Sequence, residues 1–141
     1  MLWPFGVPVD YQTCGFHTGQ DWFAAVGTPI YAIEDATVVY VGPMWLQGPD
    51  VGRGDYSIIL HHLADDGSEY YTTYGHNSVA LVTPGESVRR GQKIAEVGDE
   101  GYSPRPHLHL EKVVTPFTGN WQQPFVGCDG YRDPGSRWSP I

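Results

Sequence analysis

The spacing of apolar residues constrains the fold of this chain more than any other feature. No segment repeats apolar residues at positions i, i+3, i+4 and i+7 for three turns, as an amphipathic helix would require. Short alternating or β-branched runs recur instead, bounded by Gly, Pro or Asp. The 141 residues include 18 Gly and 12 Pro, so turns must be frequent. The sequence therefore predicts an all-β fold of antiparallel sheets.

Four of the predicted strands are expected to pair as two hairpins. A short polar connection predicts that 28–33 pairs with 37–41. The Asp-Gly step in 64–68 predicts a tight turn between 56–63 and 69–75. The remaining predicted strands, which continue a meandering antiparallel arrangement, are 87–89, 93–97 and 108–114.

The length of the chain predicts a single domain over 1–141, because one hydrophobic core of this size is typical. Its core is expected to span about 16–113. The segment 114–141 holds many turn formers, so it is expected to wrap the sheet rather than extend it. The long segment 42–55, which contains Trp45, is either a wall of a substrate groove or a plain surface excursion.

Charge and hydropathy exclude two classes of partner. The formal net charge is −8, with only eight Lys and Arg, so no basic surface for nucleic acid is expected. No stretch reaches the 18 or more apolar residues of a membrane span. The start of the chain lacks the charged and apolar regions of an export signal, so any such signal is expected outside this sequence.

The two cysteines, Cys14 and Cys128, allow two interpretations. A disulfide between them would close a loop of over 100 residues and contribute up to about 4 to 5 kcal/mol. They can equally be buried free thiols, because two cysteines are too few for the dense framework of a small secreted scaffold.

Histidines and one aspartate carry the candidate chemistry. His107 and His109 are two residues apart, so on a strand both imidazoles lie on the same face. Catalytic zinc takes three protein ligands and keeps an open position, so further ligands must come from elsewhere. His17 and Asp21, four residues apart with Gly19 between them, offer a second half of the site. Each motif alone is weak, but together they predict a metal site.

Several ordered segments resemble one family. His17 and Asp21 match a His-x-x-x-Asp pattern, and Tyr74 and His76 match a Tyr-x-His pattern. Three further segments are similar to the family's motifs: 27–32 (GTPIYA), 84–95 (PGESVRRGQKIA) and 106–111 (PHLHLE). From about Phe16 to Val113 the chain resembles the lysostaphin- or LytM-type metallopeptidases of the M23 family, which cut peptide bonds in bacterial peptidoglycan.

The resemblance implies a fold, a cofactor and roles for five residues. The fold is a sandwich-like LytM or duplicated-hybrid-type domain, with long loops walling a groove. One zinc ion is held by His17, Asp21 and His109, and the uncoordinated His76 and His107 are catalytic. The substrate is a peptide of the bacterial wall, either a cross-bridge or a stem peptide.

Three residues are candidates for contact with the substrate: Tyr74, Trp45 and Arg105. The chain departs from the family pattern at 103–106 (SPRP), where the family often has Ser-Thr-Gly-Pro, and around Trp45. These departures bear on substrate preference. The neighbouring His61 and His62 are expected to have structural roles only.

The expected site of action is extracellular, at the cell wall or on a phage particle. An acidic domain gains no electrostatic steering toward a polyanionic wall, so we expect wall targeting to come from a separate module or a larger lysin or phage assembly. Two alternatives remain. One is a catalytically inactive LytM-like binding or scaffold module that regulates other wall hydrolases. The other is a β domain with a purely structural metal, or with no metal and histidines that occur by chance.

Overall fold

The computed structural model describes residues 2–10, 14–44, 56–99, 105–135 and 139–141. In this part of the chain there are strands and no helix, and hence no helix long and apolar enough to cross a membrane. The strands are β1 (Leu2–Trp3), β2 (Gln20–Phe23), β3 (Pro29–Tyr31), β4 (Ala36–Gly42), β5 (Ser57–Leu63), β6 (Glu69–Gly75), β7 (Asn77–Ala80), β8 (Ser87–Val88), β9 (Lys93–Val97), β10 (His107–Val113) and β11 (Tyr131–Arg132).

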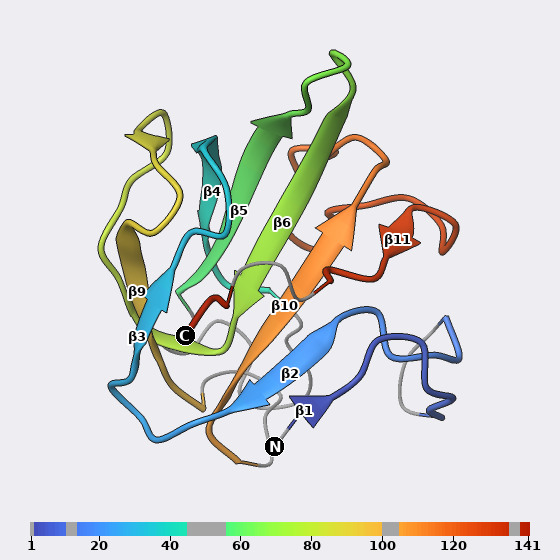
Figure 1. Ribbon diagram of the computed structural model, residues 1–141. Coiled ribbons are helices and arrows are strands. Elements are labelled where there is room, and N and C mark those ends of the chain that lie inside the picture. The colour runs from blue at the N-terminus through green and yellow to red at the C-terminus, as the bar shows by residue number, and fades with distance from the viewer. Residues whose placement is uncertain (1, 11–13, 45–55, 100–104, 136–138) are drawn as a thin grey trace.

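The strands form two sheets in which every described pairing is antiparallel (Figure 1). The large sheet has the order β1-β2-β10-β6-β5-β4-β8, and β11 also pairs with β10. The small sheet has the order β3-β9-β7. The predicted all-β antiparallel class is therefore confirmed.

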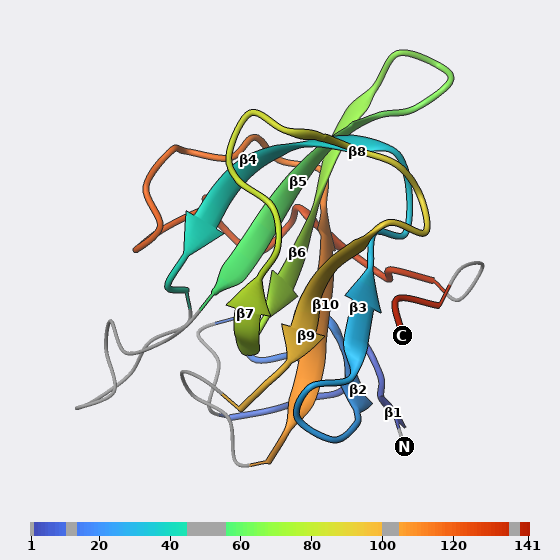
Figure 2. The ribbon, with the colours of Figure 1, turned by 90° about the vertical axis from the view of Figure 1, so that its left-hand side faces the viewer.

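The main hydrophobic core lies between the two sheets (Figure 2). Ile30 of β3 and Ile94 of β9 meet Ile58 of β5 and Leu108 of β10, and all four side chains are fully buried. Each sheet alone would leave one apolar face in water, so stacking the two sheets removes both faces from solvent. This arrangement is the expected sandwich.

The opposite face of the large sheet carries a second, smaller cluster. Ile59 and Val113 alternate along β5 and β10 with residues of the main core, so they point away from the small sheet. Phe125 of the C-terminal segment and Met44 cover them. The C-terminal segment therefore supplies part of the packing over this face.

The hairpin predicted at the Asp-Gly step is confirmed. β5 and β6 pair from Ile58 opposite Tyr74 to Leu63 opposite Glu69. Gly67 in the connecting turn has φ 85°, a left-handed conformation that glycine adopts without strain. Local turn chemistry alone was sufficient to predict this pair.

The other predicted hairpin is wrong. β3 pairs with β9 in the small sheet, while β4 pairs with β5 and β8 in the large one. The connection between β3 and β4 carries the chain from one sheet to the other, and Ala32 within it is hydrogen-bonded to Gly91 and Gln92 instead of to β4. For the same reason the predicted strands at 87–89 and 93–97 do not pair with each other.

The C-terminal segment both wraps and extends the large sheet. Tyr131 and Arg132 form β11, which adds to the edge of β10, so the prediction that this segment only wraps the sheet is wrong. Cys14 and Cys128 form a disulfide with a Cα–Cα distance of 5.7 Å. Of the two interpretations that the sequence allowed, the disulfide is therefore correct and the free thiols are not. The disulfide ties this segment to the region just before β2.

Candidate metal centre

The histidine pair lies on the face of the large sheet turned away from the small sheet. Along β10, Leu108 and Leu110 point into the core between the sheets. His107, His109 and Glu111 alternate with them and share the opposite face. The two-residue spacing therefore brings both imidazoles to one surface.

The neighbouring strand β2 brings a carboxylate to the same face. Asp21 lies directly opposite His109 in the antiparallel ladder, and Phe23 lies opposite His107. Side chains of directly opposite residues point to the same side of a sheet and are close neighbours. The β2–β10 register therefore places Asp21 beside both histidines.

His17 lies just before β2 and is held by the N-terminal segment. Its backbone N–H donates to the carbonyl of Val7 at 2.9 Å, and its carbonyl accepts from the N–H of Gly6 at 2.9 Å. Its side-chain Nδ1 is 2.9 Å from the carbonyl oxygen of Pro4. The N-terminal segment, which contains no motif of its own, thus positions His17.

Gly19 allows the chain between His17 and Asp21 to pass close to β10. A Cβ atom at Gly19 would collide with the carbonyl oxygen of Leu110 and lie 3.0 Å from Cγ of Glu111. The glycine is therefore required by a close backbone approach.

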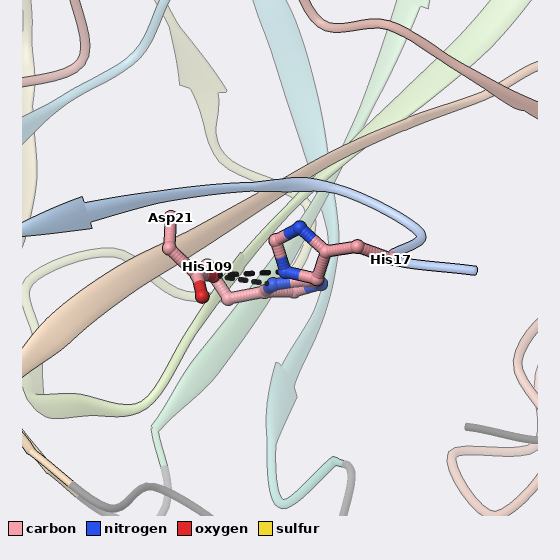
Figure 3. Close-up of side chains that lie close together, drawn as sticks. All are labelled: His17, Asp21 and His109. Carbon is pink, nitrogen blue, oxygen red and sulfur yellow. Dashed lines mark hydrogen bonds and ion pairs between the residues drawn. The ribbon is translucent and has the colours of Figure 1, made fainter. Parts of the chain in front are cut away.

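Three side chains converge on one point (Figure 3). Nδ1 of His109 is 2.8 Å and Nε2 of His17 is 3.3 Å from the same oxygen, Oδ1 of Asp21. One donor atom from each of the three residues lies within 4.8 Å of the others, and all three side chains are buried. The structure thus brings together the three residues that the resemblance implied as ligands.

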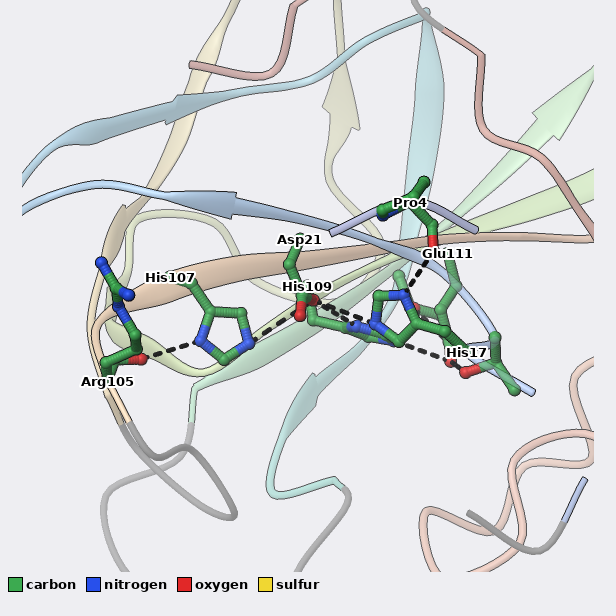
Figure 4. Close-up of polar contacts among 9 residues, drawn as sticks. Pro4, His17, Asp21, Arg105, His107, His109 and Glu111 are labelled. Atoms are coloured by element: carbon green, nitrogen blue, oxygen red, sulfur yellow. Dashed lines mark hydrogen bonds and ion pairs between the residues drawn. The ribbon is translucent and has the colours of Figure 1, made fainter. Parts of the chain in front are cut away.

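The outer hydrogen bonds of both imidazoles fix which nitrogen faces this point (Figure 4). A carbonyl oxygen only accepts, so Nδ1 of His17 carries a hydrogen toward Pro4 and leaves the lone pair of Nε2 facing Asp21. Nε2 of His109 is 3.1 Å from Oε2 of Glu111, which leaves Nδ1 facing Asp21. Metal-binding histidines characteristically have such outer partners.

Glu111 was not predicted as a site residue, although its spacing gave a signal. It continues the two-residue period of His107 and His109 on β10, which places all three on one face. Its side chain is 1% exposed, and its carboxylate accepts hydrogen bonds from the hydroxyls of Thr18 and Thr73 besides its contact with His109. The backbone carbonyl of Pro4, which accepts a hydrogen bond from His17, could not be predicted from the sequence, because any residue type supplies a carbonyl.

The electrostatics of the site favour a positive charge at its centre. Burial raises the pKa of Asp21, but hydrogen bonds with His109 and His17 lower it by more, to well below its usual range. Burial lowers the pKa of His109, but hydrogen bonds to Asp21 and Glu111 outweigh it and raise the pKa to about 9. Two buried carboxylates are thus compensated by positive charge between them, which either a protonated His109 or a bound cation supplies. Two imidazole nitrogens and one carboxylate oxygen are a donor set that zinc accepts, so the residues present fit this metal.

His107 lies at the edge of the three-residue cluster. Its Nε2 is 3.5 Å from Oδ1 of Asp21, and its Nδ1 donates to the carbonyl of Arg105 at 2.8 Å. Burial lowers the pKa of His107, which favours the neutral imidazole. A neutral ring with Nδ1–H engaged presents Nε2 as a proton acceptor.

His76 approaches the same histidines from the bend between β6 and β7. Its ring centroid is 4.7 Å from that of His107 and 6.2 Å from that of His109. Its φ is 68°, and among the described residues no other residue except glycine has a positive φ. A non-glycine residue in this region costs on the order of 1–3 kcal/mol and persists where neighbours hold it.

The neighbours of the β6–β7 bend hold that conformation. Nδ2 of Asn77 donates to the carbonyls of Tyr56 and Tyr74 at 2.9 and 3.0 Å. A Cβ atom at Gly98 would lie 2.7 Å from the carbonyl oxygen of His76, so the backbone directly after β9 packs against the bend. Strand pairing and packing thus direct the His76 ring toward the site.

The three candidate substrate-binding residues have different positions. Tyr74 is fully buried in the main core, where its hydroxyl accepts the N–H of Ile33 at 3.1 Å, so it has no surface to offer a substrate. Arg105 is exposed beside His107. Trp45, like most of the long 42–55 segment, lies outside the described residues.

His61 and His62 lie apart from this site, as their expected structural roles require. His62 is 1% exposed, and its Nδ1 donates to the carbonyl of Asp35 at 2.9 Å. His61 contacts Glu69 at 3.2 Å on the surface of the β5–β6 hairpin.

Comparison with known proteins agrees with this geometry. Residues 15–122 match Peptidase family M23. The chain belongs to peptidase family M23. This M23 chain is 34% identical to the glycyl-glycine endopeptidase ALE-1 of Staphylococcus capitis, over 83% of its own length and 31% of that protein. It is 33% identical to lysostaphin of Staphylococcus simulans, over 89% of its own length and 24% of that protein.

A third relative of the M23 chain is the peptidoglycan DD-endopeptidase ShyA of Vibrio cholerae, 39% identical over 70% of this chain and 20% of that protein. The chain therefore spans about a fifth to a third of the length of these curated relatives.

Solved structures show the same fold. The catalytic domain of lysostaphin from Staphylococcus simulans superposes with a TM-score of 0.71 and 29% identity, covering 95% of this chain and 88% of that one. A zinc-containing peptidase from Vibrio cholerae gives a TM-score of 0.64 at 31% identity, covering 79% of this chain and 32% of that one. The family and the LytM-type β fold predicted from the sequence are thus confirmed.

Proposed function

We propose that this M23 chain is a zinc-dependent endopeptidase that hydrolyses peptide bonds in bacterial peptidoglycan. The observation that carries the proposal is the convergence of His17, Asp21 and His109, with both imidazoles oriented by hydrogen bonds on their far sides. The relatives named as glycyl-glycine and peptidoglycan DD-endopeptidases support this class of substrate.

One zinc ion held by these three residues is the proposed cofactor. When bound, zinc polarises a scissile carbonyl and lowers the pKa of a bound water to about 7. Asp21 contributes a carboxylate oxygen, and Glu111 holds His109 so that its Nδ1 faces inward. Proton transfer and stabilisation of the oxyanion are proposed to be carried out by histidine side chains that do not bind the metal.

His107 is the proposed general base. Because its Nδ1–H is engaged by the Arg105 carbonyl, its Nε2 accepts the proton of the attacking water and then delivers it to the leaving amine. His76, whose ring is tilted by 52° to that of His107 with the centroids 4.7 Å apart, is the proposed donor to the oxyanion that develops on the scissile carbonyl. Both residues retain these roles only if they remain uncoordinated.

Two substitutions test these assignments. His109→Ala is expected to abolish zinc binding in metal analysis, because it removes a ligand. His107→Ala is expected to keep zinc and lose turnover. Complete zinc loss in His107→Ala would reverse the roles of the two histidines.

The proposed activity itself is tested on purified peptidoglycans of different cross-link type, with and without a chelator. Newly released termini are identified by mass spectrometry, and we expect chelator-sensitive cleavage of at least one substrate. Absent cleavage of all substrates by zinc-loaded protein would support the alternative of an inactive LytM-like module, and cleavage that is insensitive to the chelator would contradict a zinc-dependent mechanism.

The proposed substrate sets where the protein acts. Wall peptides lie outside the cytoplasm, so we propose an extracellular location, at the cell wall or as part of a larger lysin or phage assembly. An acidic domain has no general attraction to a polyanionic wall, and retention of the isolated domain on purified walls at physiological salt would count against a separate targeting module.

A further inference from the structure

We propose that the disulfide between Cys14 and Cys128 is a positioning element of the metal centre. It holds the segment that carries His17 in place, so the site reaches its full affinity for zinc only after the disulfide has formed. This inference rests on the proposed zinc-dependent function and adds a requirement for the assembly of its site. It is carried by the position of the disulfide between the His17 segment and β11.

His17 is supported differently from the other two proposed ligands. Asp21 and His109 lie within β2 and β10, which pair directly, whereas His17 lies three residues before β2. On the C-terminal side of His17, the Thr18 hydroxyl donates to the carboxylate of Glu111 and thereby anchors the chain to β10. The N-terminal side of His17 needs a support of its own.

The hydrogen bonds on that N-terminal side come from a segment with little packing. Residues 4–9 lie antiparallel to 15–17 and bond both the backbone and the ring of His17. None of the side chains in 4–9 is fully buried. A segment that buries little apolar surface opens locally at a low cost in free energy. These hydrogen bonds alone therefore restrain His17 only weakly.

The disulfide adds a covalent anchor at this point. Cys14 lies three residues before His17, and its partner Cys128 lies just before β11. The rings of Phe16 and Tyr131 also meet edge to face, with centroids 6.4 Å apart. β11 pairs with β10, the strand that carries the other proposed histidine ligand (Figure 1). The disulfide and this ring contact thus connect the two histidine ligands through a second route.

A disulfide with this position has two separable effects. It links residues 114 apart in the sequence, which restricts the unfolded chain and raises stability. That effect leaves the affinity of the folded chain for zinc unchanged. A disulfide that also limits local opening around His17 reduces the ordering that metal binding requires, and so raises the affinity of the folded chain. Zinc affinity and stability must therefore be measured independently.

The double variant Cys14→Ser/Cys128→Ser tests the inference without leaving thiols that could bind zinc themselves. Its zinc affinity is measured by competition with a chromophoric chelator, at a temperature at which the metal-free protein is fully folded. We expect Kd to rise by at least about tenfold, because a ligand loses its outer support. An unchanged Kd would overturn the inference.

Val88→Ala is the matched control for general destabilisation. Val88 is 2% exposed and lies on β8, at the edge of the large sheet opposite β1, so its truncation removes core contacts far from the site. We expect this variant to lower the thermal midpoint of the metal-free protein and to keep the wild-type Kd for zinc. An equal rise of Kd in Val88→Ala and in the double variant would assign the effect to stability and overturn the positioning role.

Hydrogen exchange of the metal-free proteins decides the inference even if no zinc is bound. The N–H groups of His17 and Gly6 bond across the paired segments and are expected to exchange at least about tenfold faster in the double variant than in the wild type. Val88→Ala is expected to keep the wild-type rates at both positions. Equal rates in the wild type and the double variant would overturn the positioning role. Absence of zinc binding by the oxidised wild type would instead overturn the proposed zinc-dependent function.

Reduction of the zinc-loaded wild type covers the case in which the double variant does not fold. A water-soluble phosphine breaks the S–S bond and is oxidised to the phosphine oxide, while water supplies the oxygen and the two thiol protons. Iodoacetamide then blocks both thiols. We expect zinc to pass to the chelator while the tryptophan fluorescence of the folded chain persists. Zinc that stays bound, or that leaves only as this fluorescence is lost, would overturn the inference.

Discussion

Glu111 determines which nitrogen of His109 faces the metal position. It is 1% exposed and its carboxylate contacts Thr18, Thr73 and His109, so these three residues rather than bulk solvent satisfy its oxygens. Glu111→Gln keeps the shape but removes the charge and forces an amide N–H toward one of these groups. We expect zinc affinity to fall by about 10- to 100-fold, as measured by competition with a chromophoric chelator.

An exposed carboxylate provides the control for this prediction. Glu69→Gln, on the β5–β6 hairpin, makes the same chemical change at a surface position and is expected to leave zinc affinity unchanged. Equal affinities for wild type and Glu111→Gln would mean that the β10 backbone alone orients His109.

His62 makes stability depend on pH through a group outside the site. Burial lowers its pKa from 6.5 to about 4, against a hydrogen bond to the Asp35 carbonyl that raises it. Between these two values the unfolded chain binds a proton that the folded chain does not, so the free energy of unfolding decreases as the pH falls from 6.5 to 4. The loss is on the order of 3 kcal/mol.

Urea unfolding at pH 7 and pH 5, in the presence of chelator, measures this effect. His62→Gln is the comparison, because an amide can replace the hydrogen bonds of His62 to the Asp35 carbonyl and to Oγ1 of Thr72 and does not titrate. The decrease in stability between the two pH values should be smaller in His62→Gln than in the wild type. The same decrease in both proteins would assign the pH dependence to other groups.

At the level of elements, the β6–β7 bend holds His76, a proposed catalytic residue, in a strained conformation. Asn adopts the left-handed region more readily than most residues, so His76→Asn preserves the bend. We expect this variant to fold, to bind zinc as the wild type does, and to lose turnover by about 100-fold or more. His61→Asn is the same substitution at a surface histidine and should retain activity.

The thermal midpoint adds a second observation on the same bend. A midpoint of His76→Asn at or above that of the wild type, together with lost turnover, would show that the histidine is kept for chemistry. A large fall in the midpoint would instead make His76 a structural residue of the β6–β7 connection.

The elements that the sequence predicted correctly are those determined locally. The β5–β6 hairpin follows from an Asp-Gly turn between two alternating runs, and both partners are adjacent in the chain. β3 and β4 are also adjacent, but each finds its partner far away, in β9 and β5. Packing of two sheets around one core decides that choice, and no single segment encodes it.

The same distinction applies to the site. His107 and His109 could be placed on one face because strand alternation is a local property. Bringing His17 and Asp21 to them depends on β2 pairing with β10, a contact across 88 residues between Asp21 and His109 that only the ordered motifs of a family could predict. Glu111 could have been predicted from the same alternation along β10, whereas the contact of the Pro4 carbonyl with His17 could not.

For the whole molecule, the metal is expected to act as a stabilising crosslink. A ligand that binds only the folded state adds RT ln(1 + [L]/Kd), or about 4 kcal/mol at a thousandfold excess over Kd. Chelation should therefore lower the thermal midpoint of the wild type by several degrees, as measured by calorimetry, and restoring zinc should reverse the change. His109→Ala, which lacks a proposed ligand, should show no response to the chelator.

The direct pairing of Asp21 with His109 also makes the metal a reporter of strand register. Sliding β2 by one residue would set Trp22 opposite His109 and turn the Asp21 carboxylate into the apolar interior, so only one alignment of the two strands creates a binding site. A zinc ion bound by Asp21 and His109 is therefore expected to stabilise this alignment of β2 and β10 over its competitors. We accordingly expect the yield of correctly folded protein on refolding to be higher with zinc than with chelator.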